Sequence, residues 1–445
     1  MNLRRWLTPG IGVKRWLLVT FAGCLILALG VAHFVRQATQ DVNPGGLIGA
    51  ALDTITLQFL PYWGRGLLAG LLGIALVGFG AYRTIRALTS PFMPSAGTGG
   101  RLVELIFQRK SLARGPRVVV IGGGTGQSTL LRGLKEHTSN LTAIVAVADD
   151  GGSTGVLRDT MAIPPVGDIR RCLAALADDE TLVGEVLEHR FAGSPTASTP
   201  EAGGPLGGHP LGNILLAAMT QLQSGDFEEA VRLANRVLAV RGQVLPAAAA
   251  PLTMHARLHD GSTIDGQSLI TKARGIERAW VTPADLPASE DALAAIADAE
   301  VIVLGPGSIY TSLLPSLLLP QVSEAIATSS ALRIFVCNVA TQLGETMGMD
   351  LADHVAALTA HAGPDIVDVV LANNRLLGTA LRPPAEPVRL TWPPDVTPLP
   401  KLVLDDVVDP TAAQRHDPRR LAAAIVRIHE REGSARRRAA VGRTA

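Results

Sequence analysis

A glycine-rich turn directly after a short apolar stretch is the segment of this sequence best suited to bind an anion. Residues 117–121 (RVVVI) are mostly β-branched, and four of the next five residues, 122–126 (GGGTG), are glycine. Glycines let a backbone approach a phosphate closely, and the start of a helix supplies oriented N–H groups. Leucines at helical spacing follow in residues 130–134, so the pattern predicts a strand, a phosphate-binding turn and a helix.

This glycine pattern matches neither of two common nucleotide-binding motifs. Gly122 and Gly124 fit the dinucleotide motif G-x-G-x-x-G, but Gln127 stands at its third glycine. The P-loop requires a lysine after its last glycine, and Gln127 occupies that place as well. The sequence therefore argues against an NAD-dependent dehydrogenase and a P-loop ATPase. A tight turn without a ligand is the alternative interpretation.

Two adjacent carboxylates follow the next apolar stretch. Residues 142–147 predict a second strand, which ends at Asp149 and Asp150 before the turn 151–153 (GGS). Carboxylates in this place can bind ribose hydroxyls, a polar substrate or a divalent metal such as Mg²⁺. Side chains of neighbouring residues diverge, so we expect only one of the two to face the site. A simple Asx turn is the alternative.

Charged and polar side chains stand at two further expected helix starts. Residues 164–171 (PPVGDIRR) place Asp168 before two arginines, and either Arg170 or Arg171 could clamp a diphosphate in bidentate fashion. A surface arginine beside a helix cap is the alternative. Residues 208–213 (GHPLGN) bring a histidine and an asparagine to the start of an apolar helix. These side chains suit hydrogen bonding to a base or sugar, and the histidine could also act as a general base.

A second glycine-rich turn repeats the first pattern later in the chain. A strand expected at residues 300–304 ends in residues 305–308 (GPGS), and an apolar helix interrupted by Pro315 follows at 312–319. Backbone N–H groups and hydroxyls in such a turn can again bind phosphate. Polar side chains after the next strand, at residues 338–345, would complete the wall of the site. Two such turns favour a ligand with a diphosphate, or two phosphorylated ligands that meet.

These motifs require a sheet that brings strand ends together. From residue 117 to about 406 the pattern alternates strands and helices, with further strands expected at 333–337 and 366–371. It predicts an α/β fold with a Rossmann-like, doubly wound, mostly parallel sheet, in which ligands collect at the carboxyl ends of the strands. Residues 254–264 predict a hairpin, with residues 276–282 as a further antiparallel strand. The two glycine turns are therefore expected to open onto one shared crevice.

Composition separates the first part of the chain from the rest. The chain has 445 residues, a formal net charge of +1, which indicates no nucleic-acid partner, and three cysteines without metal-ligand spacing. Two apolar runs, at about 17–35 and 64–82, are each long enough or nearly so to cross a bilayer. Basic residues flank the pair, so positive-inside counting predicts a transmembrane hairpin with both termini and the main domain in the cytoplasm. Buried core helices are the alternative.

The expected organisation has four parts. They are a membrane hairpin (1–88), a linker (89–115), an α/β nucleotide-binding domain (116–406), and a C-terminal helix with a basic tail (407–445). Asp417 and Pro418 form a suitable cap and first residue for that last helix. The expected location is the plasma membrane, as a multi-pass protein bound to the lipid bilayer.

Six segments together resemble the gluconeogenesis factor (YvcK-like) family, which is related to 2-phospho-L-lactate transferase (CofD-like). They are GGGTGQSTLLRGL, VADDGGSTGVLRD, PPVGDIRRCL, GHPLGNILLAA, GPGSIYTSLLP and CNVATQLGET, and they span residues 118 to about 345. The resemblance implies a Rossmann-like fold and binding of a UDP-sugar such as UDP-GlcNAc. It also implies a role in cell shape and cell-wall morphogenesis during gluconeogenic growth.

A transferase is the second functional hypothesis. The transferase branch has a Pro-Lys pair after its glycines, whereas this chain has Gln127 and Ser128. A transferase would move a phospholactyl group from a guanosine diphosphate donor to a deazaflavin, with Mg²⁺ held by Asp149 or Asp150. We expect a nucleotide-sugar-binding protein first, and a homo-oligomer is compatible with the sequence. The expected nucleotide and phosphate site comprises Gly122, Gly123, Gly124, Thr125, Gly126, Gln127, Asp149, Asp150, Gly151, Gly152, Ser153, Asp168, Arg170, His209, Asn213, Gly305, Pro306, Gly307, Ser308, Thr311 and Asn338.

Overall fold

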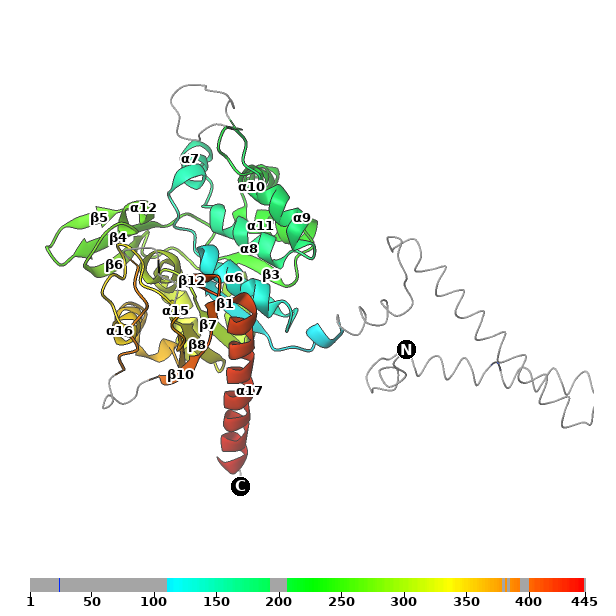
Figure 1. Ribbon diagram of the computed structural model, residues 1–445. Coiled ribbons are helices and arrows are strands. Elements are labelled where there is room, and N and C mark those ends of the chain that lie inside the picture. The colour runs from blue at the N-terminus through cyan, green and yellow to red at the C-terminus, as the bar shows by residue number, and fades with distance from the viewer. Residues whose placement is uncertain are drawn as a thin grey trace, which may run out of the picture. The chain divides into compact units, whose positions relative to one another are not determined.

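The computed structural model describes residues 110–192, 206–377, 381, 385–392 and 400–443, together with Cys24; for residues 433–443 it describes the backbone alone. Contacts divide the chain into two compact units, Met1–Gln108 and Arg109–Ala445. Apart from Cys24, every described residue belongs to the second unit, so the fold reported below is that of Arg109–Ala445 (Figure 1).

A seven-stranded sheet forms the centre of this unit. Its strand order is β10-β9-β8-β7-β1-β2-β3, and every neighbouring pair is parallel. The strands are β1 (Val118–Gly122), β2 (Leu141–Val145), β3 (Gln243–Pro246), β7 (Val301–Leu304), β8 (Leu332–Val336), β9 (Val369–Asn373) and β10 (Lys401–Asp405). All residues of β1, β2 and β7 are buried, as unbroken Val and Ile runs require when helices cover both faces of a sheet. The α/β, Rossmann-like, parallel fold predicted from the sequence is confirmed.

Helices cover the sheet on both faces. The chain runs β1-β2-β3 toward one edge and β7-β8-β9-β10 toward the other, so right-handed crossovers put the helices that connect β1 to β3 and those that connect β7 to β10 on opposite faces. Helices between β1 and β3 are α6 (Gly124–Leu134), α7 (Gly152–Met161), α8 (Gly167–Leu176), α9 (Glu180–Glu188), α10 (Leu211–Leu222) and α11 (Phe227–Val237). Later helices are α12 (Gln267–Ile270), α13 (Glu290–Asp298), the π-helix η3 (Ile309–Leu313), α14 (Leu314–Leu317), α15 (Pro320–Thr328), α16 (Leu351–Ala362), the 3-10 helix η4 (Pro364–Ile366) and α17 (Pro418–Arg443).

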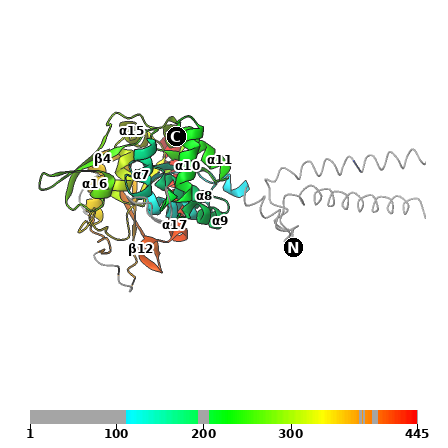
Figure 2. The same cartoon turned by 90° about the horizontal axis from the view of Figure 1, so that it is seen from above.

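Two small antiparallel sheets complete the unit. Strands β4 (Thr253–Leu258), β5 (Thr263–Asp265) and β6 (Ile276–Thr282) form one of them, in the order β5-β4-β6. It lies to one side of the central sheet in both views (Figure 1, Figure 2). This confirms the predicted hairpin and its antiparallel partner. Strands β11 (Val408–Asp409) and β12 (Ala412–His416) form the other sheet just before α17.

The central sheet has a switch point between β1 and β7. After β1 the chain continues to β2 on one side, and it returns later to place β7 on the other side of β1. Val118 is therefore in register with both Leu141 of β2 and Val301 of β7. Loops leave a switch point in opposite directions and create space for a ligand at the carboxyl edge. Both glycine-rich turns follow the two strands that meet there.

The expected membrane location requires a correction. The two apolar runs at 17–35 and 64–82 lie outside the described residues, as does most of the expected linker 89–115. Among the residues that the structure does describe, no helix is long and apolar enough to cross a membrane. Most described helices are short and cover the sheet, and the longest, α17 with 26 residues, is rich in arginine. The assignment to the plasma membrane as a multi-pass protein, with the bilayer as a partner, is therefore wrong.

Candidate functional site

The two glycine-rich turns touch each other at the carboxyl edge of the sheet. A Cβ atom added to Gly126 would lie 2.3 Å from the carbonyl oxygen of Pro306, and one added to Gly307 would lie 3.5 Å from the carbonyl oxygen of Gly123. Only glycine at position 126 permits this approach of one backbone to the other. Gly124 and Gly305 both have positive φ angles, +67° and +82°. The structure thus brings both turns, residues 122–126 and 305–308, into one place.

Backbone N–H groups at the start of α6 face a carboxylate of the protein. Gly123 caps this helix without a side-chain hydrogen bond, so the first N–H groups remain for other partners. The Asp168 carboxylate accepts a hydrogen bond from the N–H of Gly124. Its Oδ1 also accepts a 2.6 Å hydrogen bond from Nη1 of Arg171. The first N–H group of α6 is therefore paired with a carboxylate of the protein.

Two carboxyl groups at this edge are electrostatically coupled. Burial raises the pKa of Asp168 above its ordinary value, and the neighbouring Arg171 guanidinium opposes that rise. Burial also raises the pKa of Asp149, a hydrogen bond from the N–H of Gly151 lowers it, and the charge of Asp168 adds to the rise. Negative charge is already dense here, so an anionic ligand must displace Asp168, bring a cation, or bind with a proton.

Asp149 and Asp150 diverge, as expected for neighbouring side chains. Asp149 Oδ1 accepts from the N–H of Gly151 at 3.0 Å, while Asp150 Oδ1 accepts from the N–H of Ser268 in α12 at 2.9 Å. Asp149 is the carboxylate that lies near Asp168, because its Oδ2 is 3.4 Å from the position of a Cβ on Gly167. Within the described ranges, no group of three or more histidine, cysteine, aspartate or glutamate side chains is arranged to hold a metal ion.

Gln127 is part of the sheet rather than of the surface of the site. Its side chain is fully buried, and Nε2 donates to the carbonyl oxygens of Val120 and Ile144 at 2.9 and 3.0 Å. The Sγ of Cys172 donates to its Oε1 at 3.4 Å. The amide therefore joins β1 to β2 at the position where a P-loop would have its lysine. Its hydrogen-bonding groups are all used inside the protein.

The two adjacent arginines have different surroundings. Arg170 is 2% exposed and makes two 3.1 Å hydrogen bonds to the carboxylate of Glu188 and one of 2.5 Å to Oδ1 of Asn213. The side chain of Arg171 is 39% exposed and lies against Asp168. Arg171, which the expected site left out, is thus the arginine at the carboxyl edge. Helical spacing could have identified it, because residues three apart share a face and adjacent residues do not.

A buried group of polar side chains surrounds the start of α7. Ser153 Oγ lies 2.8 Å from Nδ1 of His209, and Nδ2 of Asn213 donates to the same oxygen at 2.9 Å. All three residues are less than a tenth exposed. Burial lowers the pKa of His209, and the positive charge of Arg190 lowers it further. The structure thus assembles Ser153, His209 and Asn213 from segments far apart in the sequence.

The second glycine turn is held from the β8 side. Asn338 makes two hydrogen bonds to the backbone of Gly307, one to its N–H (3.2 Å) and one to its carbonyl (3.0 Å). Thr311 in η3 donates to Oε1 of Glu345 at 2.6 Å, and both side chains are buried. Burial raises the pKa of Glu345 to about 7. Asn338, Thr311 and Glu345 therefore fix the turn and the π-helix that follows it, and Ser308 in the turn is half-buried.

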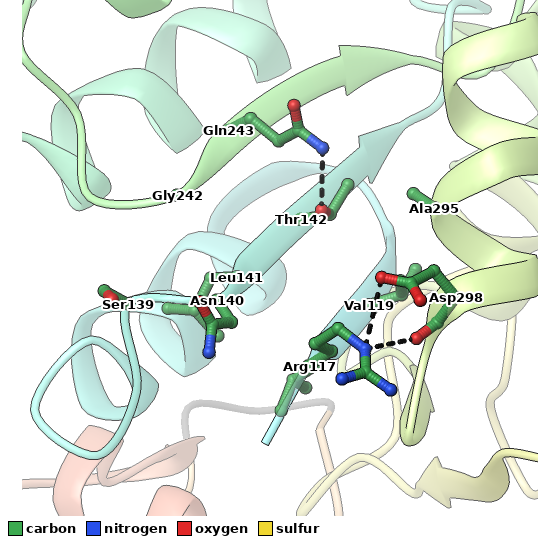
Figure 3. A pocket seen from close by; sticks show the side chains of 11 residues that line it. Arg117, Val119, Ser139, Asn140, Leu141, Thr142, Gly242, Gln243, Ala295 and Asp298 are labelled. Atoms are coloured by element: carbon green, nitrogen blue, oxygen red, sulfur yellow. Dashed lines mark hydrogen bonds and ion pairs between the residues drawn. The ribbon is translucent and has the colours of Figure 1, made fainter. Parts of the chain in front are cut away.

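A pocket also lies at the opposite edge of the sheet, away from both glycine turns. It has a volume of about 280 Å³ and lies at the amino-terminal ends of β1, β2 and β3. Arg117 on its wall is bonded to the side chain of Asp298, and Gln243 donates to Thr142 at 3.1 Å (Figure 3). Its polar groups are largely paired with one another. The polar side chains singled out above belong to the carboxyl edge instead.

Comparisons with known proteins place the chain among related sequences and structures. The family model of 2-phospho-L-lactate transferase CofD matches residues 118–393. A protein of Nostoc sp. named as a putative gluconeogenesis factor is 42% identical over 437 residues, which cover 95% of this chain and 92% of the relative. The gluconeogenesis factor of Bacillus subtilis is 44% identical over 58% of this chain and 79% of its own length. A crystal structure of a UPF0052 family member from Bacillus halodurans superposes with a TM-score of 0.62 at 40% identity, covering 70% of this chain and 99% of that one.

Proposed function

Since the chain belongs to the CofD-like family and, within it, to the gluconeogenesis factors, we propose that its carboxyl edge binds a nucleotide sugar of the UDP-GlcNAc type. One observation carries the proposal: two glycine-rich turns touch at the switch point of the sheet. The first turn can offer the N–H groups at the start of α6 to one phosphate. The second can offer Ser308, because the N–H groups of Gly305 and Gly307 are bonded to Ile121 and Asn338. A nucleotide sugar carries two phosphates in succession.

Each polar residue at the carboxyl edge then has a role in ligand binding. The N–H groups at the start of α6 and the N–H and hydroxyl groups of Ser308 would hold the diphosphate, and Arg171 would supply a compensating positive charge. Asp149 would bind the ribose. His209 would contact the sugar or its phosphate. Asp168 would leave the N–H of Gly124 to the ligand, because a carboxylate and a phosphate compete for the same donor.

The donor set also fits a divalent cation that arrives with the ligand. Mg²⁺ is commonly held by one or two carboxylates together with substrate phosphates, and Asp149 and Asp168 are coupled carboxylates at this edge. When bound, the cation would neutralise the charge of the diphosphate. Asp150 would take no part, because Ser268 already binds its Oδ1.

The physiological role that we attach to this binding is regulatory. A site without an identified nucleophile suits a protein that responds to the level of a cell-wall precursor. We therefore propose a role in cell shape and cell-wall morphogenesis during gluconeogenic growth, of which only the link to gluconeogenesis appears in the name of the relatives.

Calorimetric titration of the full-length protein with UDP-GlcNAc tests the binding. We expect saturable heat for the wild type and at least tenfold weaker binding for Arg171→Ala, since a charge-assisted contact to phosphate contributes about 1.5–3 kcal/mol. Arg236→Ala is the matched control, because Arg236 is an exposed arginine at the end of α11. No heat with millimolar UDP-GlcNAc would reject the proposal.

A transferase remains the second candidate because the matching family model describes 2-phospho-L-lactate transferase. This reaction would use a guanosine diphosphate donor and a deazaflavin acceptor. The position expected to carry a lysine holds the buried Gln127, whose amide is fully occupied. Incubation with donor, acceptor and Mg²⁺ beside an active transferase decides the question. Product formation would establish turnover, and its absence in the presence of UDP-GlcNAc binding would leave the regulatory role.

A further inference from the structure

Five polar side chains form a continuous hydrogen-bonded chain that ends at His209. In order they are Glu188, Arg170, Asn213, Ser153 and His209, and we call them the Glu188–His209 chain. They come from α9, α8, α10, α7 and the loop before α10, and all but Glu188 are buried. These side chains contain few donors and acceptors. Only one arrangement of their hydrogen atoms therefore gives every hydrogen bond a donor and an acceptor.

The direction of the first bonds follows from the arginine. A guanidinium can only donate, so the atom of Asn213 that lies 2.5 Å from Nη1 of Arg170 must be the acceptor Oδ1. The other end of the amide is then the NH₂ group, which donates to Ser153 Oγ at 2.9 Å. The reverse orientation would place two donors against each other. Glu188 holds Arg170 in place by accepting from both Nε and Nη2.

The last bond fixes the histidine. Among the hydrogen bonds of the described residues, the hydroxyl hydrogen of Ser153 has one acceptor, Nδ1 of His209, at 2.8 Å. An imidazole nitrogen that accepts carries no hydrogen, so the hydrogen of neutral His209 lies on Nε2. The lowered pKa of His209 agrees with a neutral ring. Within the described part of the chain, Nε2 has no hydrogen-bond partner and so can donate its hydrogen to a ligand.

We propose that Glu188, Arg170 and Asn213 are positioning residues which, through Ser153, hold His209 as the Nε2–H tautomer, so that it donates a hydrogen bond to an acceptor oxygen of the ligand. Ser153 lies in the first turn of α7, four residues after Asp149, which places His209 beside the carboxyl edge. The ligand part of this inference rests on the proposed function, whereas the tautomer part does not. In this role His209 is a donor that selects a phosphate or hydroxyl oxygen, and it is not a base.

Nitrogen NMR on the full-length protein with ¹⁵N-labelled histidine tests the tautomer without any ligand. Comparison with His209→Gln assigns the signal. We expect Nε2 to carry the proton and Nδ1 to be unprotonated. In Asn213→Asp, both side-chain oxygens accept, so Ser153 turns its hydrogen to the new carboxylate and His209 must donate from Nδ1. A wild-type ring protonated at Nδ1, or a tautomer unchanged in a folded Asn213→Asp protein, would overturn the inference. Should that variant not fold, the wild-type spectrum alone decides.

Two substitutions of His209 test the donor role in ligand binding. The amide nitrogen of glutamine can reach the place of Nε2, whereas that of asparagine reaches only the place of Nδ1. With UDP-GlcNAc as the titrant we expect His209→Gln to retain affinity within a few-fold and His209→Asn to lose about tenfold, the value of one net hydrogen bond. Equal affinities of the two variants would overturn the donor role. If the wild type binds no UDP-GlcNAc, the proposed function fails while the NMR result stands.

Discussion

At the scale of single residues, Gln127 shows how a side chain in a nucleotide-binding motif can serve the sheet. Replacing it with glutamate would remove both donors and set a buried carboxylate against two carbonyl oxygens. We expect Gln127→Glu to lower the free energy of unfolding by about 3 kcal/mol or more, measured by urea denaturation. Gln221→Glu, at an exposed position of α10, is the control and should change stability by less than about 0.5 kcal/mol. Equal stability of the two variants would show that Gln127 does not hold β1 to β2.

Glu345 predicts a pH dependence of stability. Burial raises its pKa from 4.5 to about 7, so the folded protein holds this proton more tightly than the unfolded chain does. The stability that it contributes is complete below pH 4.5 and is lost as the pH rises from 4.5 through 7. Relative to Glu345→Gln, the wild type should therefore lose about 3 kcal/mol over this range. Urea denaturation of both proteins at about pH 4.5, 6 and 8 measures it, and parallel curves would contradict the assignment.

Residue types at the site could be predicted from the sequence, but their directions could not. The predicted glycines, Asp149 and Asp168 do lie together at the carboxyl edge of the sheet. Gln127 and Arg170 have equally suitable side chains, yet both point into the protein because backbone carbonyls and Glu188 bind them there. Such partners come from distant segments, which no local spacing reveals.

At the scale of elements, the contact between the two glycine turns carries the site. Gly126→Ala would place a Cβ 2.3 Å from the Pro306 carbonyl, so α6 and the second turn must separate. We expect a loss of roughly 1–3 kcal/mol in stability and weaker UDP-GlcNAc binding. Gly184→Ala in exposed α9 is the matched control, because nothing lies near its Cβ, and it should stabilise by about 0.5–1 kcal/mol. Normal stability and binding of the Gly126→Ala variant would show that the turns need not touch.

The start of α17 offers a second test at this scale. Asp417 Oδ1 accepts from the N–H groups of Arg419 and Arg420, both at 2.9 Å, and the helix packs on α6. Asp417→Ala should cost about 1 kcal/mol, whereas Asp417→Asn, which can still cap, should cost little. Thermal denaturation measures both. Identical melting temperatures for the two variants would show that the cap is not needed.

Most elements could be predicted from local pattern, and the exceptions have physical reasons. Strand β6 spans the seven residues, Ile276–Thr282, that were expected to form it. The helix expected at 312–319 is instead a π-helix followed by the short α14, because Pro315 cannot donate to the turn before it. The sequence pattern does not predict strand β3, because its four residues end in a proline, which argues against a strand inside a sheet. Strand β3 lies at the edge of the sheet, where a proline is tolerated.

At the scale of the whole molecule, the order of the strands explains why one edge collects the polar residues. Strand β1 begins at Val118 and β7 begins at Val301. Strands β2 and β3 and the small sheet of β4, β5 and β6 lie between them in the sequence. The two strands nevertheless pair along their length. Pairing puts two turns that are distant in sequence at the same switch point. Sequence could predict that two such turns exist and share a sheet, but the neighbour relation of β1 and β7 is a property of the assembled fold.

A crystal structure of the protein with UDP-GlcNAc tests the central claim most directly. The account predicts the diphosphate between residues 122–126 and 305–308, with Asp168 displaced from the N–H of Gly124 and Arg171 in contact with a phosphate oxygen. A ligand bound elsewhere, such as in the pocket at the amino-terminal ends of the strands, with Asp168 still bonded to Gly124, would contradict it.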